Sequence, residues 1–320
     1  MNASHEGLST LFYDTKQLIF VGGKGGVGKS STASAVAFHL SKRHPTLLIS
    51  TDPAHSLSDS LQEKLHSEIT SISLEGHQLF AKELDASKTF QGFKEKHEAE
   101  IRLLFDTSTH FDEEDIDEIM SLMLPGIDEV MGLKSIVDIL QGGTYQKVVV
   151  DTAPTGHALR LLFMPQLLNT WIKTMATLRW KYRLIQKTFK GKYTADDADD
   201  LLMDLKRSVA RMTAILTDAS RCEFILVTIP NQMAMAETCK LHQQLTKKNI
   251  AVNTLIINHI APKSTDPFYQ EWHVNQQKII QQTIEKFSTI HTIQMPLFAS
   301  EVHGIHRIQQ FEEVLFNQTS

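Results

Sequence analysis

Short apolar runs alternate along the chain with segments in which apolar residues recur every three or four positions. The runs are apolar at nearly every position, which is typical of strands buried on both faces of a parallel sheet. The segments between them have the spacing of amphipathic helices and would connect parallel strands. The pattern predicts an α/β fold with a mostly parallel, doubly wound sheet, and its expected strands include residues 18–21, 47–50, 79–81, 148–150, 224–227 and 255–257.

Residues 86–217 interrupt this alternation. The strand-like run among them is 148–150, and the other apolar residues fall at helical spacing, as Leu201, Leu205 and Val209 do. Helical segments on both sides of one strand indicate two insertions that fold together. We therefore expect an inserted helical subdomain made of residues 86–140 and 161–217, and a nucleotide-binding sheet domain made of residues 1–85, 141–160 and 218–320.

Composition and charge exclude several classes of protein. The 320 residues are 42% hydrophobic and 22% charged, so the chain can bury a sizeable core. The 32 Lys and Arg against 37 Asp and Glu give a net charge of −5, which offers nucleic acid no general attraction. The 2 cysteines are too few for a disulfide framework, and we find neither a signal peptide nor the ~18 apolar residues of a membrane span. We expect a cytoplasmic protein with no nucleic-acid partner.

The strongest local signal is the segment GGKGGVGKSS at residues 22–31, which fits the pattern GxxxxGK[ST] between a predicted strand and a predicted helix. Glycines allow the backbone to curl around a phosphate group, and the start of the helix adds positive charge. We expect Lys29 to reach the β- and γ-phosphates and the Ser30 hydroxyl to bind Mg²⁺. A glycine-rich turn without a ligand is the alternative. The residues expected to bind nucleotide are Gly23, Lys24, Gly25, Gly26, Val27, Gly28, Lys29, Ser30 and Ser31.

Two carboxylates follow predicted strands. Asp52 comes after the run at 47–50, and the carboxyl ends of strands in an open α/β sheet form a ligand crevice. Its carboxylate could orient an attacking water molecule, or it could cap the next helix. Asp151 ends the run at 148–150 and has the position of a Walker B carboxylate that holds Mg²⁺ through the water molecules around the ion.

Three segments together, GGKGGVGKSS, DPAHSLSD and DTAPTGHALRLL, resemble the family of arsenite-pump ATPases and tail-anchored-protein targeting ATPases, and the similarity covers nearly the whole chain. The resemblance implies a P-loop NTPase fold, hydrolysis of ATP with Mg²⁺, and switches at residues 52–59 and 151–160. It also implies a homodimer in which Lys24 reaches the partner subunit's nucleotide. A plain exposed lysine is the alternative.

The resemblance further implies that Asn258 and the loop from Pro296 through Leu297 hold the adenine, and that Glu237 lies at the nucleotide interface. Asn258 could equally be a turn residue at the end of a strand. Many members of the family clamp the dimer with zinc through a CxxC pair, whereas residues 266–273 contain no cysteine here, so zinc is not expected. Neither cysteine of the chain has a thiol neighbour in sequence, which weakens a role in metalloid binding.

Seven of the 11 methionines lie between residues 113 and 217. Methionine is flexible and suits grooves that accept varied apolar partners. By resemblance, ATP would close the dimer and assemble a groove for a hydrophobic transmembrane segment. The interior of a helical bundle is the alternative. The candidate groove residues are Met120, Met123, Met131, Met164, Met175 and Met212.

The resemblance thus predicts a homodimeric, Mg²⁺-dependent ATPase that binds and delivers hydrophobic transmembrane segments. A membrane receptor or transporter is a further expected partner, with transient association with the membrane. Two alternatives stay open: an ATPase subunit that drives an arsenite or anion pump, and a nucleotide-dependent switch or assembly factor. The basic, aromatic run at 179–192 would be a mobile lid over the groove or a solvated loop.

Overall fold

The chain forms two compact units. The first comprises Met1–Leu84, Ile139–Leu159 and Ile215–Ser320, and the second comprises Asp85–Asp138 and Arg160–Ala214. The computed structural model describes residues 8, 10–52, 56–63, 65, 68–106, 127–153, 162, 165, 168–177, 179–180 and 196–317.

The first unit is built on one 8-stranded sheet with the order β3-β4-β2-β5-β1-β6-β7-β8. Neighbouring strands are parallel except for β3 and β4. The predicted α/β fold with a mostly parallel sheet is confirmed. The strands are β1 (Leu18–Gly23), β2 (Thr46–Ser50), β3 (Thr70–Ile72), β4 (Leu79–Glu83), β5 (Lys147–Asp151), β6 (Cys222–Thr228), β7 (Thr254–Ile260) and β8 (His291–Pro296).

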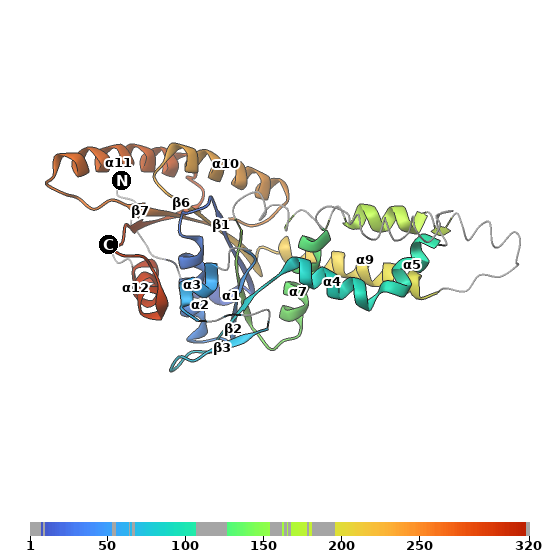
Figure 1. Ribbon diagram of the computed structural model, residues 1–320. Coiled ribbons are helices and arrows are strands. Elements are labelled where there is room, and N and C mark those ends of the chain that lie inside the picture. Colours follow the sequence, from blue (N-terminus) through green and yellow to red (C-terminus); the bar gives the residue numbers. More distant parts are fainter. Residues whose placement is uncertain are drawn as a thin grey trace, which may run out of the picture. The chain divides into compact units, whose positions relative to one another are not determined.

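Helices cover both faces of this sheet, which explains the uninterrupted apolar runs of the inner strands. Figure 1 shows α10 and α11 along one face and α2, α3 and α12 along the other. Ile19 and Val21 join the buried cluster that contains Val36 of α2, whereas Phe20 faces the opposite way and stacks on Phe224. The helices of this unit are α1 (Thr10–Thr15), α2 (Lys29–Ser41), α3 (Ser56–Leu61), α10 (Gln232–Lys247), α11 (Pro267–Lys286) and α12 (Gly304–Phe316).

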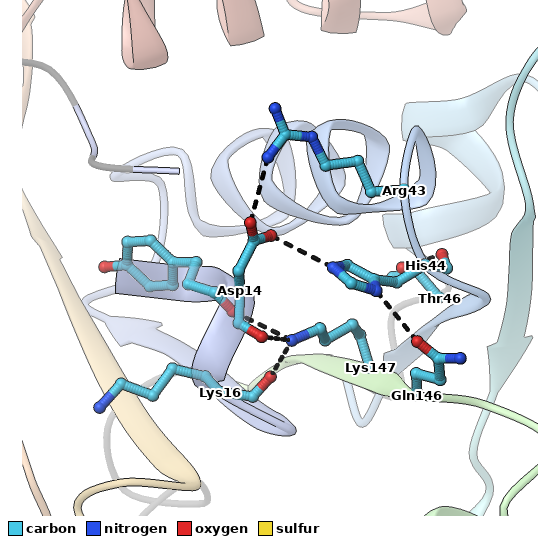
Figure 2. Close-up of polar contacts among 8 residues, drawn as sticks. Asp14, Lys16, Arg43, His44, Thr46, Gln146 and Lys147 are labelled. Atoms are coloured by element: carbon cyan, nitrogen blue, oxygen red, sulfur yellow. Dashed lines mark hydrogen bonds and ion pairs between the residues drawn. The ribbon is translucent and has the colours of Figure 1, made fainter. Parts of the chain in front are cut away.

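A polar network holds α1 at the end of the sheet where the strands begin (Figure 2). Lys147 is buried, and its ammonium group donates to the carbonyl oxygens of Tyr13 at 3.3 Å and Lys16 at 2.7 Å, and also to that of Asp14. The Asp14 carboxylate accepts from Arg43 at 3.1 Å. Burial lowers the pKa of Lys147, although nearby Asp14 opposes that shift. These polar groups hold α1 in place. The carboxyl ends of the parallel strands lie at the opposite end of the sheet.

The second unit is helical in its described part. Asp85 begins it by capping α4, since its carboxylate accepts from the Lys88 backbone N–H at 3.0 Å. Among the described residues, no helix is long and apolar enough to cross a lipid bilayer. The helices are α4 (Ala86–Lys96), α5 (Glu98–Asp106), α7 (Ile127–Gln141) and α9 (Asp197–Leu216), and the last two end in the first unit.

The first residue of the basic run at 179–192 forms ion pairs with the acidic residues that follow the run. Arg179 is buried, and its guanidinium donates to Asp199 at 3.0 Å and to Asp196. The alternative to a lid, a solvated loop, is wrong for Arg179, whose buried charge is compensated by two carboxylates. Residues 181–195 of the proposed lid lie outside the described residues.

Candidate functional site

The glycine-rich segment joins the end of β1 to the start of α2. Gly28, immediately before α2, has a φ of 92°, in the left-handed region that favours glycine. A Cβ atom at Gly28 would lie 2.3 Å from the side-chain nitrogen of Asn258, and one at Gly23 would lie 2.1 Å from the carbonyl oxygen of Val227. The loop therefore needs glycine at these positions because other strands approach its backbone closely.

Lys29 lies across this loop. Its side chain is 7% exposed, and its ammonium group donates to the carbonyl oxygen of Lys24 at 3.1 Å. Burial lowers the pKa of Lys29, and the carboxylates of Asp151 and Asp52 oppose that shift. The structure thus brings together three predicted site residues that come from α2, β5 and the segment after β2.

Asp151, the last residue of β5, is fully buried. Neither of its carboxylate oxygens accepts a hydrogen bond of normal length within the part of the chain that is described, although the Ser30 hydroxyl lies near the carboxylate. Burial raises the pKa of Asp151 to about 6, although the Ser30 hydroxyl and the Lys29 ammonium lower it. A buried, unsatisfied carboxylate is costly, and a divalent cation that prefers oxygen ligands would relieve that cost.

The oxygen donors at this position fit Mg²⁺. Ser30 and Asp151 provide a hydroxyl and a carboxylate close enough to interact. Among the described residues, no three His, Cys, Asp or Glu side chains are grouped to hold a metal ion. Mg²⁺ does not need such a cage, because it commonly keeps water ligands and takes others from substrate phosphates.

Asn258 connects β7 to the glycine-rich loop. Its side chain is 2% exposed, and its Nδ2 donates to the carbonyl oxygen of Val27 at 3.0 Å. Its Oδ1 is buried without a partner in the described structure. Pro296 ends β8, and the Leu297 N–H donates to the carbonyl oxygen of Ile260 at 2.8 Å. The tertiary structure therefore places the loop from Pro296 beside the end of β7, where Asn258 reaches the glycine-rich loop.

Lys24 and Glu237 meet within one chain. Their Nζ and Oε1 atoms are 3.4 Å apart, and the two side chains are 31% and 34% exposed. The Lys24 ammonium also lies 2.7 Å from the sulfur of Met233, which like Glu237 belongs to α10. Such exposed ion pairs contribute between 0 and about 1 kcal/mol, so Lys24 can exchange this partner for another at little cost.

Asp52 follows β2, and its N–H donates to the Ser50 hydroxyl at 3.2 Å. Further along the same segment, the N–H and hydroxyl of Ser58 both donate to Glu83 at the end of β4, at 3.1 Å and 2.8 Å. Sequence reasoning did not identify Glu83, although a glutamate that ends an apolar strand run was a possible signal. This pair anchors α3, the helix after Asp52, to the sheet.

The switch at 151–160 is described only as far as Ala153, where the Thr152 hydroxyl donates to the carbonyl oxygen of Val21 at 2.9 Å. Of the candidate groove residues, Met131 and Met212 are 2% and 1% exposed, and Met175 is half-buried. Residues 53–55 of the first switch and the remaining candidates lie outside the described residues; these candidates are Met120, Met123 and Met164.

Comparison with known proteins adds a family to this geometry. The profile of the family described as anion-transporting ATPase matches residues 16–317. The chain is 33% identical over 325 residues to ATPase ASNA1 homolog 1 of Paramecium tetraurelia, across 96% of this chain and 94% of that protein. It is 30% identical to ATPase GET3B of Arabidopsis thaliana, across 94% of this chain and 79% of that protein. The chain therefore belongs to the anion-transporting ATPase family, and it is an ATPase.

Proposed function

We propose that the chain binds ATP with Mg²⁺ at the carboxyl ends of β1, β2, β5 and β7 and hydrolyses it as a homodimer. The buried Asp151 carboxylate, beside Ser30 and Lys29, is the observation that carries the proposal. Ser30 and Asp151 would hold Mg²⁺, directly or through water. The ion would supply positive charge that stabilises the phosphate oxygens during transfer. The membership of an ATPase family supports this reaction.

The remaining predicted residues complete this site. The N–H groups of residues 23–31 bind phosphate oxygens, and the Lys29 ammonium neutralises charge on the β- and γ-phosphates. Asp52, which is close enough to influence the charge of Lys29, orients the attacking water molecule. Asn258 and the loop from Pro296 through Leu297 contact the base.

We propose that the dimer completes each site by exchanging ion pairs. Within one chain Lys24 pairs with Glu237. In the closed dimer Lys24 leaves Glu237 and contacts the nucleotide of the partner subunit, while Glu237 stays at the interface. A cation supplied in trans stabilises charge that develops on the transferred phosphoryl group.

Mixing two inactive variants tests this exchange. Lys24→Ala retains the phosphate loop but lacks the cation in trans, and Lys29→Met retains Lys24 but loses the phosphate contact. Each variant alone should be nearly inactive. After exchange of subunits, half of the dimers are mixed and each has one complete site, so hydrolysis should return to roughly a quarter of the wild-type rate.

The measurement is phosphate release from the mixture and from each variant alone. Wild-type chain mixed with Lys29→Met controls for the exchange of subunits. A mixture as inactive as its two components, under conditions where exchange is demonstrated, would show that Lys24 does not act in trans. A monomer throughout hydrolysis, measured by sedimentation, would contradict the dimer itself.

We also propose that the ATPase cycle opens and closes a groove in the helical unit that carries hydrophobic transmembrane segments. The motif resemblance and the methionines of this unit support it. Met131 and Met212 are buried in the present arrangement, so the groove requires the helices to separate. A cavity of about 570 Å³ among the described helices is lined mainly by charged side chains, including Lys96, Glu100 and Asp204, and it does not itself suit an apolar segment. The cytoplasmic location and the membrane receptor stay predictions.

A capture experiment tests the client. Asp52→Asn with ATP and Mg²⁺ should accumulate the closed dimer, and a 20-residue apolar peptide should then co-elute with it. The same peptide with two central lysines is the control, because charge in the segment opposes burial. Equal retention of both peptides, or of neither, would contradict the targeting function while leaving ATP hydrolysis intact.

Anion transport is a second candidate function, because the family is described as anion-transporting ATPase. The two cysteines weaken an arsenite-binding version of it. Cys222 is fully buried, and burial with the nearby Glu223 raises the pKa of its thiol to about 12, so the metal-binding thiolate form is disfavoured. Cys239 is half-buried on α10. Stimulation of hydrolysis by arsenite in a variant that lacks both cysteines would favour this function with other ligands.

A further inference from the structure

His259, the residue after Asn258, has an unusual backbone conformation. Its φ is 58°, in the left-handed region that residues with a Cβ atom rarely adopt. The pairing of β7 with β8 also shifts register between Ile257 and Ile260. Backbone strain of this kind persists where neighbouring groups hold it, and it is concentrated at functional sites.

Side chains from α11 hold His259 in place. Gln276 is 6% exposed, and its Nε2 donates to the carbonyl oxygen of His259 at 3.2 Å while its Oε1 accepts from the Ala261 N–H at 2.8 Å. The His273 ring accounts for the remaining polar group of Ala261, since Nδ1 donates to that carbonyl oxygen at 2.9 Å. One buried amide therefore joins the carbonyl oxygen of the strained residue to the N–H group two residues later, and all of these contacts are made to backbone atoms.

The imidazole of His259 lies toward the glycine-rich loop. The Cβ position at Gly28 is 4.0 Å from His259 Nε2 and 2.3 Å from Asn258 Nδ2. The ring is half-buried, and burial lowers the pKa of His259. A neutral imidazole has an uncharged aromatic face, which is the kind of surface on which nucleobases stack.

We propose that His259 is a base-contacting residue of the ATP site, whose imidazole packs against the purine ring. This inference rests on the proposed ATP-binding function of the glycine-rich loop. Three observations support it: the imidazole lies beside Gly28, the buried Oδ1 of Asn258 next to it is unsatisfied in the described structure, and α11 maintains a conformation that costs energy in the free chain. The two hydrogen bonds of Gln276, which we call the Gln276 clamp, keep the His259 ring over the glycine-rich loop.

Two substitutions separate the ring from the backbone. His259→Asn removes the ring but retains a residue that tolerates the left-handed conformation. His259→Phe retains an aromatic face without ring nitrogens. Stacking of one base on an aromatic side chain is worth about 1–3 kcal/mol, so His259→Asn should raise the KM for ATP roughly 5- to 150-fold with little change in kcat. His259→Phe should restore most of the lost affinity, and His306→Ala, at an exposed position on α12, is the matched control.

Ribose 5-triphosphate, which lacks only the base, distinguishes a base contact from a general role in the loop. Its inhibition constant should be the same for wild type and His259→Asn. An unchanged KM for ATP in His259→Asn would overturn the proposal, and so would equal weakening of ATP and ribose 5-triphosphate. If the wild-type chain binds neither compound, the proposed function fails together with this inference, whereas failure of His259 alone leaves the phosphate site standing.

Discussion

Replacing Lys29 with methionine is expected to lower kcat for ATP hydrolysis roughly 10²- to 10³-fold, the size of effect that one preorganised charge has on a transition state. Lys29 is buried across the glycine-rich loop and donates to the carbonyl oxygen of Lys24. Asp151 and Asp52 both influence its charge. Methionine keeps the length of the side chain and removes its charge. Steady-state phosphate release at saturating ATP and Mg²⁺ measures the effect.

Lys278→Met is the matched control, since Lys278 is exposed on α11 and should tolerate the change. Circular dichroism and the Tm of both variants show whether the fold is retained. Hydrolysis by a folded Lys29→Met protein within twofold of the wild-type rate would remove Lys29 from the mechanism. It would also mean that the lysine of the GxxxxGK[ST] pattern does not act as the phosphate-binding cation in this chain.

Asp151→Asn is expected to abolish hydrolysis and at the same time to stabilise the protein in the absence of ATP and Mg²⁺. Hydrolysis should fall at least roughly 10²-fold, because a neutral amide provides less charge at the proposed Mg²⁺ position. Stability should rise because the Asp151 carboxylate is buried without a hydrogen-bond partner among the described residues. The substitution should therefore lower the rate of hydrolysis and raise the stability, which distinguishes the role of Asp151 in the site from its effect on folding.

The pH dependence of stability gives the sign of this second effect. Burial raises the pKa of Asp151 from 3.8 to about 6 in the folded chain. The folded state therefore binds this proton more tightly than the unfolded state does, and the free energy of unfolding falls as pH rises from about 4 to about 6. Above that range the cost of the charged carboxylate is on the order of 2–3 kcal/mol. Asparagine does not titrate and avoids that cost.

Thermal unfolding at pH 4, 5.5 and 7.5 tests the expectation. The Tm advantage of Asp151→Asn over wild type should be greatest at pH 7.5 and should shrink toward pH 4. Asp197→Asn, a substitution at an exposed aspartate, should show no such trend. A Tm below wild type at pH 7.5 would mean that the folded chain stabilises the Asp151 carboxylate, which would contradict the uncompensated burial from which the Mg²⁺ position is argued.

The fold was largely predictable because a strand that is buried on both faces of the sheet is apolar at nearly every position. The apolar runs of β1, β2, β5 and β6 are fully buried along their length. β3 and β8 escaped prediction for the opposite reason. β8 lies at one edge of the sheet and is exposed at both of its ends, whereas β3 at the other edge has only 3 residues. A partly buried edge strand has no uninterrupted apolar run, and the alternation of buried and partly exposed residues in β8 covers too few positions to predict a strand.

The phosphate loop was readable from the sequence alone because its ligands are the backbone groups of consecutive residues. Contiguity makes a pattern of glycines, lysine and serine sufficient to predict where a phosphate binds. Asp52 and Asp151 were also predictable as candidates, since each follows a strand and parallel strands end at one edge of the sheet. Family membership followed from the same motifs.

Only the tertiary structure decided which distant residues surround that loop. The pairing of Lys24 with Glu237 joins elements that are far apart in the chain, and the anchor from Ser58 to Glu83 joins α3 to β4, which β3 separates in the sequence. The Gln276 clamp on His259 joins β7 to the next helix, but it forms only once α11 has packed on the sheet. The order of strands in the sheet and the packing of α10 and α11 bring them together, and neither is encoded in local periodicity. Burial without a partner, which gives Asp151 its raised pKa, likewise exists only after the surrounding elements have packed.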